Sequence, residues 1–207
     1  MGTLYLIRHG EVKWNREAAY VGSTDLPLDL TGRMQAERLT GYLESKCISA
    51  VYSSDLMRAY QTAEIIANRM GLPVHALKEL READYGDWEG VPEIEVPKLY
   101  PGIFEQWRDD VLNVRIPGGE TFAELRDRAF PAFCRIAEAH PDGQVVIVAH
   151  KSTNRVILCC LLGVDVNTYR QLGQGNAAVN IIHRRQDGSF VVETINECCH
   201  LVDSVTS

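Results

Sequence analysis

Two histidines and two arginines follow short apolar runs that are typical of buried strands. Arg8 and His9 end the first run, Arg58 comes shortly after the second, and His150 ends the clearest one, V-V-I-V-A. Guanidinium groups match phosphoryl oxygens and stabilise the charge that spreads over them during transfer. A neutral imidazole can itself attack phosphorus, and Gly10 after His9 permits a ligand to approach closely. The residue types therefore predict phosphoryl transfer, with His9 as nucleophile and His150 as a clamp on the equatorial oxygens.

One carboxylate completes this set. Glu82 follows a further apolar run and opens a long irregular segment. Burial under that segment and the charge of a departing phosphate favour its protonated form, so we expect Glu82 to protonate the leaving oxygen. Because the sequence has neither a Walker loop nor a magnesium-type carboxylate cluster, we expect no metal and no cofactor.

The elements that would position these groups alternate between strand and helix patterns along the chain. Apolar runs predict strands at 3–7, 50–53, 74–77 and 145–149, and apolar faces predict helices within 36–43, 59–70, 122–136 and 154–162. Such alternation predicts a single α/β domain over residues 1–207, with three α/β/α layers, a mainly parallel central sheet and an irregular lid insertion. In an open sheet of this kind ligands bind at the carboxyl ends of the strands, where the candidate residues lie.

Local signals refine the boundaries of these elements. Thr31 is the expected cap of the first long helix, and the T-F-A-E stretch from Thr121 to Glu124 has the spacing of a capping box. Pro131 predicts a kink in the helix that follows. Residues 177–183 and 190–195 are expected to close the sheet as two strands around a D-G turn.

The segment from 82 to 119 fits neither periodicity and is expected to form a lid. Its aromatic residues either pack in a core or line a pocket for an organic leaving group, and both readings stay open for Tyr85, Trp88, Phe104 and Trp107. Acidic residues outnumber basic ones there, with Glu89, Glu93, Glu95, Glu105, Asp109 and Asp110 against Lys98, Arg108 and Arg115. This balance favours a larger, less charged organic phosphate over a small, highly anionic sugar acid.

The composition of the 207-residue chain limits the kinds of partner that it can bind. Its 21 basic and 28 acidic residues give a net charge of −7, and with no run of like charges it is expected to bind neither nucleic acid nor a membrane. The first apolar stretch is too short for a signal peptide or a membrane span, so the cytoplasm is the expected compartment. Six cysteines are then reduced thiols. Cys198, Cys199 and His200 could form a metal patch, but buried thiols at a strand end are the simpler interpretation.

Several blocks of the sequence together resemble the histidine phosphatase superfamily, also called the phosphoglycerate-mutase-like family. They are L-Y-L-I-R-H-G-E at the start, S-S-D-L-M-R-A-Y-Q-T-A from 53, L-R-E-A-D-Y-G-D-W-E-G from 80, P-G-G-E-T from 117 and V-I-V-A-H from 146. R-H-G alone is a weak signal, whereas all blocks in this order and spacing are a strong one, and they span essentially the whole chain.

The resemblance implies a role for each matching residue. His9 is the residue that becomes phosphorylated, and Glu82 falls where the family's proton donor does. The phosphate pocket is implied to consist of Arg8, Asn15, Arg58 and His150. The family usually has a small residue after the second histidine, where this chain has Lys151. Lys151 either adds positive charge beside the substrate, as a further binding residue, or turns outward.

Three functions are compatible with these residues. The L-R-E-A-D-Y-G-D-W-E-G block resembles the phosphatase branch, including enzymes of the alpha-ribazole phosphatase type, more than the N-E-R-x-Y-G block of the mutases. We therefore expect a phosphatase acting on a small phosphorylated metabolite through phosphohistidine. A cofactor-dependent phosphoglycerate-type mutase is the alternative, and a non-catalytic relative that only binds phosphorylated ligands is the third. A homodimer is left open.

Overall fold

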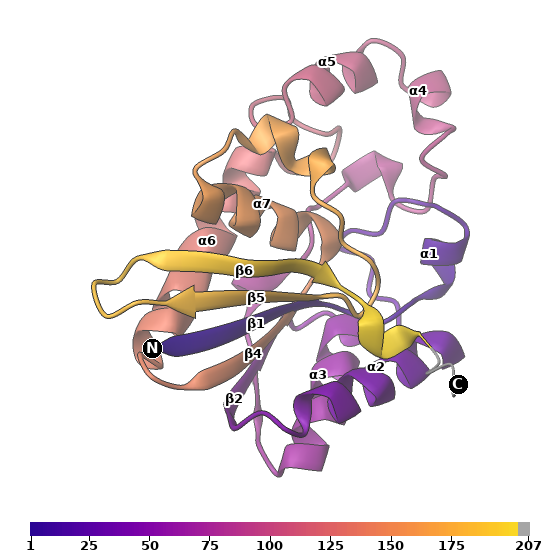
Figure 1. Ribbon diagram of the computed structural model, residues 1–207. Coiled ribbons are helices and arrows are strands. Elements are labelled where there is room, and N and C mark those ends of the chain that lie inside the picture. Colours follow the sequence, from indigo (N-terminus) through magenta and orange to yellow (C-terminus); the bar gives the residue numbers. More distant parts are fainter. Residues whose placement is uncertain (203–207) are drawn as a thin grey trace.

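The computed structural model describes residues 1–202 and has one six-stranded sheet between two layers of helices (Figure 1). The strands are β1 (Gly2–Arg8), β2 (Ile48–Ser53), β3 (Val74–Ala76), β4 (Gln144–Ala149), β5 (Val179–Arg184) and β6 (Phe190–Glu197). Their order is β3-β2-β4-β1-β5-β6, with β1 to β4 parallel to one another. The closing strands β5 and β6 are antiparallel, as the sequence predicted.

The helices connect these strands and cover both faces of the sheet. The α-helices are α1 (Lys13–Arg16), α2 (Leu30–Leu43), α3 (Met57–Met70), α4 (Val96–Leu99), α5 (Ile103–Asp109), α6 (Phe122–Ala139) and α7 (Lys151–Leu162). Four short 3-10 helices are η1 (Lys78–Leu80), η2 (Gly86–Trp88), η3 (Val166–Gln171) and η4 (Cys199–Leu201). In Figure 1, α2 and α3 cover one face of the sheet, and α6 and α7 cover the other.

The alternation of side chains along β1 explains the two helical layers. Leu4 and Leu6 belong to the hydrophobic cluster under α6 and α7, whereas Tyr5 and Ile7 belong to the cluster under α2 and α3. Successive residues of a strand point to opposite faces, so a strand that is apolar at every position requires cover on both sides. The expected three-layer α/β/α class is confirmed.

Two helix starts test the capping predictions. Thr121 caps α6 as expected, since its side chain accepts a hydrogen bond from the backbone N–H of Glu124. The predicted cap at Thr31 is wrong, because Asp29 caps α2 by accepting from Gly32 N at 2.8 Å. Both residue types are good caps, and the Asp29 carboxylate starts the helix two residues earlier and complements its dipole.

The segment from 82 to 119 contains η2, α4 and α5 and extends beyond the sheet, at the top of Figure 1. Trp88 and Trp107 have no exposed surface and pack edge to face, with ring centres 4.9 Å apart. Of the two interpretations, packing in a core is thus correct for Trp88 and Trp107. Tyr85 instead lines the cavity described below. The buried aromatic residues of the insertion therefore extend the hydrophobic core under α6 and α7, and only selected side chains of the insertion line the site.

The two cysteines that follow β6 are more exposed than the sequence predicted. Cys198 is only half-buried and Cys199 is exposed, so these are not buried strand-end thiols, because the chain leaves β6 and turns into η4 at the edge of the molecule. Within residues 1–202 no group of three or more His, Cys, Asp or Glu side chains could hold a metal ion. In the same range no helix is long and apolar enough to cross a bilayer.

Candidate active site

The two histidines meet where β1 and β4 end. These strands are parallel neighbours, and the backbone N–H of His9 donates to the carbonyl oxygen of Ala149 at 3.1 Å. The His9 and His150 rings consequently lie side by side, with centres 5.1 Å apart and planes inclined by 59°. The topology alone brings together two residues that are 141 positions apart.

One hydrogen bond decides the tautomer of His9. Its Nδ1 lies 2.6 Å from the carbonyl oxygen of Gly10. A carbonyl can only accept, so Nδ1 carries the proton and Nε2 carries the lone pair. Burial, followed by the charges of Arg58 and Arg8, lowers the pKa of His9 well below its ordinary value. At neutral pH this imidazole is uncharged, with Nε2 available for nucleophilic attack.

Both arginines are buried and held by backbone carbonyls. Arg8 donates from Nη1 to Gln174 O at 2.8 Å, and Arg58 donates to the carbonyl oxygens of Thr24 and Gly22 at 2.9 and 2.7 Å. Burial lowers the pKa of each guanidinium to about 10, which leaves both charged at neutral pH. Arg58 is therefore not a surface ion-pair partner. Two fixed positive charges adjoin the histidine pair.

His150 has a feature that a purely structural histidine would lack. It is fully buried, and neither ring nitrogen has a hydrogen-bond partner within the described part of the chain. Burial, together with the charges of Arg58 and His9, lowers its pKa well below the ordinary value. The Nε atoms of Arg8 and Arg58 are also buried and unpartnered. Unpaired buried polar groups are costly, and their clustering here marks a place suited to bind an anion.

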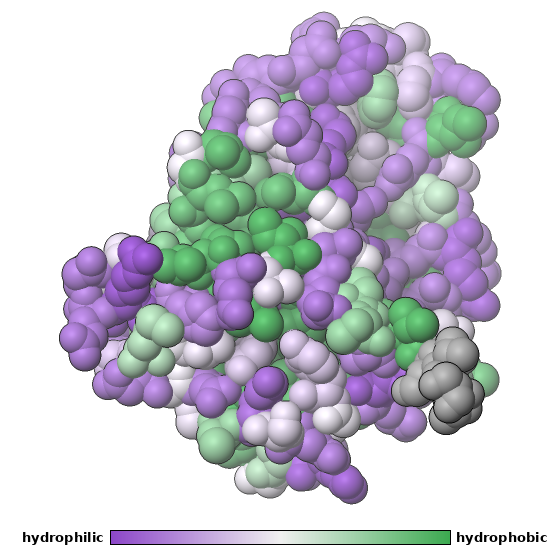
Figure 2. Space-filling view, in the orientation of Figure 1, coloured by the Kyte–Doolittle hydropathy of each residue, from purple (hydrophilic) through white to green (hydrophobic). Residues whose placement is uncertain are grey.

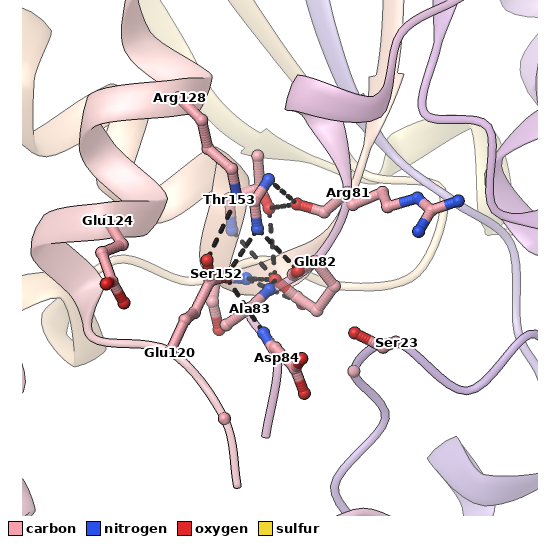
Figure 3. A network of polar contacts seen from close by, with 12 residues as sticks. Ser23, Arg81, Glu82, Ala83, Asp84, Glu120, Glu124, Arg128, Ser152 and Thr153 are labelled. Atoms are coloured by element: carbon pink, nitrogen blue, oxygen red, sulfur yellow. Dashed lines mark hydrogen bonds and ion pairs between the residues drawn. The ribbon is translucent and has the colours of Figure 1, made fainter. Parts of the chain in front are cut away.

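Glu82 lies opposite the start of α7, and Figure 3 shows the contacts that hold it. Its Oε1 accepts from the backbone N–H groups of Ala83 and Thr153 at 2.9 and 3.1 Å, and its Oε2 accepts from that of Ser152 at 3.0 Å. The side chain is only 5% exposed and borders the cavity. This carboxylate is thus ordered by α7 and is not a solvated loop residue.

A second layer holds the backbone around Glu82. Arg128 of α6 donates to the carbonyl oxygens of Arg81 and Glu82, both at 2.8 Å, and pairs with the carboxylate of Glu120 at 2.6 Å (Figure 3). Glu120 in turn accepts from the backbone N–H of Asp84 at 3.0 Å. The irregular segment is therefore anchored at its first residues, beside the predicted proton donor.

A cavity of about 460 Å³ opens over these groups. Of the predicted residues, its walls include Arg8, His9, Asn15, Glu82 and Lys151. The structure also settles the direction of Lys151, which faces the cavity, at 3.5 Å from a carboxylate oxygen of Glu93. Arg58 and His150 do not line the cavity. Arg58 acts from within the protein, where its charge lowers the pKa of both histidines.

Sequence reasoning missed several cavity residues, and their charges reverse one expectation. Arg155, Arg170 and Asn176 line the same cavity, and of the six acidic lid residues only Glu93 does. The cavity is therefore basic, although the lid is acidic overall. The composition of the lid was misleading because most of its carboxylates face away from the cavity. The four-residue spacing of Lys151 and Arg155 on α7 was the available signal.

A close crossing of two backbones shapes the turn after His9. A Cβ atom on Gly10 would lie 2.4 Å from the carbonyl oxygen of Gly32, and a Cβ atom on Gly32 would lie 2.1 Å from that of Glu11. Neither position can accept a side chain without moving the backbone. The backbone at the start of α2 therefore packs directly against the loop that follows His9.

Comparisons with known proteins agree with this geometry. Residues 4–197 match the model of the "Histidine phosphatase superfamily (branch 1)". The chain is 33% identical over 201 residues to phosphoserine phosphatase 1 of Hydrogenobacter thermophilus, covering 97% of this chain and 95% of that protein. It is 32% identical over 206 residues to a probable phosphoglycerate mutase of Salmonella choleraesuis, covering 96% and 94%. The alpha-ribazole phosphatase from Shigella flexneri superposes with a TM-score of 0.85 at 26% identity, covering 94% and 96%.

The chain belongs to the histidine phosphatase superfamily, branch 1. Within that superfamily it is a phosphoric monoester hydrolase. The resemblance to both alpha-ribazole phosphatases and phosphoglycerate-mutase-like proteins is confirmed.

Proposed function

We propose that the enzyme hydrolyses a small organic phosphomonoester through a phosphohistidine on His9. The observation that carries this proposal is the free Nε2 of His9, set by the bond from Nδ1 to Gly10 O, beside Arg8 and Arg58. Nε2 attacks phosphorus while the bond from phosphorus to the ester oxygen breaks. Arg8 in the cavity wall stabilises the equatorial oxygens, whose charge increases in the transition state, and the fully buried Arg58 and His150 add to this stabilisation from within the protein. The Nδ1–H bond to Gly10 then supports the positive ring of phosphohistidine.

Glu82 supplies the proton that the leaving alkoxide requires. Its Oε2 accepts a backbone bond from Ser152, whereas Oε1 accepts several, so Oε2 is the oxygen with capacity for a proton. After the alcohol leaves, the Glu82 carboxylate takes a proton from water, whose oxygen attacks phosphorus and breaks the bond to Nε2. Asn15 and Lys151 bind the substrate from the cavity wall.

A trapping experiment tests this assignment. Rapid acid-free quenching with a ³²P-labelled aryl phosphate should leave label on the protein that acid releases and base does not, because a phosphoramidate is acid-labile. His9→Ala should abolish the label. His75→Ala is the matched control, since His75 is exposed on the edge strand β3, and it should retain the label. Labelling in His9→Ala but not in His150→Ala would reverse the two roles.

A mutase is the second candidate, and the basic cavity is the observation that favours it, because a mutase must retain an anionic product beside phosphohistidine. Incubation with 3-phosphoglycerate, primed with the bisphosphorylated acid, distinguishes the two functions. We expect free phosphate or no reaction. Efficient formation of the 2-phospho isomer without phosphate release would establish the mutase.

The remaining expectations about partners and compartment extend this proposal. The basic cavity supports a small phosphorylated metabolite as partner, and the net charge of −7 argues against nucleic acid. Six unpaired cysteines support the cytoplasm. Hydrophobic side chains gather over β6 and α7 in Figure 2, and β6 is an edge strand. Leu162, the last residue of α7, is 43% exposed. This face supports a homodimer. Light scattering should give twice the monomer mass, and Leu162→Glu should reduce it.

A further inference from the structure

Three cations line the cavity outside the phosphate pocket. Lys151 and Arg155 stand four residues apart on α7 and so share one helix face, while Arg170 comes from η3. Arg170 is stacked, with its guanidinium carbon 4.5 Å from the centre of the Trp107 ring and 4.8 Å from that of Tyr169. Arg155 is tied by Nε to the carbonyl oxygen of Leu172 at 2.6 Å. Two of these three groups are thus held in place.

The positive charges exceed the negative ones in the cavity wall. Lys151 pairs with Glu93, but neither Arg155 nor Arg170 has a carboxylate partner among residues 1–202. Arg155 also lies close enough to Arg8 and Lys151 to lower the pKa of each, adding to the effect of burial. Like charges at this helix spacing destabilise the protein unless an anion offsets them.

We propose that the cavity holds a second anionic group of the substrate, a carboxylate or a phosphate, between Arg155 and Arg170, with Lys151 beside it. This inference rests on the proposed hydrolysis of a phosphomonoester and narrows its substrate class. The phosphoryl group binds at His9, and the second anion accepts hydrogen bonds from the terminal nitrogens of Arg155. Within residues 1–202 the Arg155 guanidinium lies over the Tyr169 ring at 5.7 Å and donates from Nε, and its terminal nitrogens have no hydrogen-bond partner. A guanidinium presents two parallel donors to either anion.

Matched substrates of graded length test the subsite. Phosphate esters of ω-hydroxy carboxylic acids with two to four carbons would be compared with the alkyl phosphates of equal length. A third series, the alkanediol bisphosphates, carries a second phosphate instead. None of them has a free hydroxyl, so transfer within the substrate does not occur. At the best chain length, kcat/KM for the charged ester should exceed that for the alkyl ester by about tenfold or more, which is the contribution expected of one charge-assisted hydrogen bond.

Variants then assign that preference to the arginines. Arg155→Gln and Arg170→Gln should each reduce the ratio of kcat/KM between the matched esters toward one, and Arg155→Lys should preserve part of it. The control is Arg69→Gln, which removes an exposed arginine paired with Glu44 at the far end of α3 and should leave the ratio unchanged. The second anion is a carboxylate if the acid series gives the higher ratio of kcat/KM to the alkyl esters, and a phosphate if the bisphosphate series does.

Three results would overturn the subsite. They are equal kcat/KM for charged and alkyl esters, a preference for the alkyl esters, and a ratio that survives both glutamine variants. Each leaves the proposed hydrolysis standing, because phosphate is still released. Absence of phosphate from every ester, including an aryl phosphate, would instead contradict the proposed function itself, and the subsite with it.

Discussion

Removal of the Arg58 charge should move the pH dependence of the reaction as well as its rate. Arg58 is, after burial, the largest cause of the lowered pKa of both His9 and His150. In Arg58→Met that positive charge is gone, protonation of the histidines becomes easier, and their pKa values rise. Because only neutral His9 is a nucleophile, activity should be lost at a higher pH than in the wild type as the pH falls.

The size of the effect follows from the burial of these groups. A unit charge within several ångströms, at an effective dielectric constant of about 20, shifts a pKa by roughly one to two units. Loss of a fixed charge that stabilises the transition state should lower kcat by about 10² to 10³, comparable to the loss of one oxyanion donor. The variant also leaves the carbonyl oxygens of Gly22 and Thr24 without their donors, at a cost of about 1–3 kcal/mol each, partly offset because a buried charge is removed.

The assay is kcat/KM for an aryl phosphate between pH 4 and 8, with urea unfolding of each protein at the same pH values. Ionisation of the substrate is identical for both enzymes, so a difference between their acid limbs reports the protein. Arg69→Met, an exposed arginine on the same helix, is the control and should keep the wild-type profile. An acid limb in Arg58→Met that is unchanged, or displaced to lower pH in a folded protein, would refute the electrostatic role given to Arg58.

Four other predictions concern the same site. Glu82→Gln should slow alkyl phosphates far more than nitrophenyl phosphate, which needs little protonation of its leaving group; equal slowing would indicate a binding role instead. The pKa of His150 is lowered in the folded protein, so as the pH falls this side chain is protonated first in the unfolded state. The free energy of unfolding should therefore keep the full contribution of neutral His150 above pH 6.5 and fall below that pH by up to about 1.4 kcal/mol per pH unit. Urea unfolding of His150→Gln should show a shallower fall, and an equal slope would contradict this. Gly10→Ala should cost about 1–3 kcal/mol in urea unfolding, since its Cβ would lie 2.4 Å from Gly32 O, and an unchanged midpoint would refute the backbone crossing. Excess chelator should leave aryl phosphate hydrolysis intact and vanadate should inhibit it, whereas activity restored by magnesium after chelation would count against a reaction carried by arginine and histidine alone.

The sequence by itself determined the residues that stand at strand ends. Arg8, His9 and His150 stand at the ends of apolar runs that predict buried strands, and parallel strands place their carboxyl ends along one edge. Their convergence is a consequence of topology and needs no knowledge of packing. Thr121 was equally predictable, because a capping box is a contact between residues three positions apart.

Only the tertiary structure decided the environment of these residues. Glu82 lies in a stretch without periodicity. Apart from the neighbouring Ala83, the backbone amides that hold it come from some 70 positions away and have no residue signature. The charge of the cavity was likewise hidden, because Arg170 is held in place by packing on Trp107 and Tyr169, which lie on different elements. Patterns along the chain report local geometry and the burial of an element. The sign of the charge in a cavity depends on which side chains of distant elements face one another. Packing of the layers decides which side chains these are.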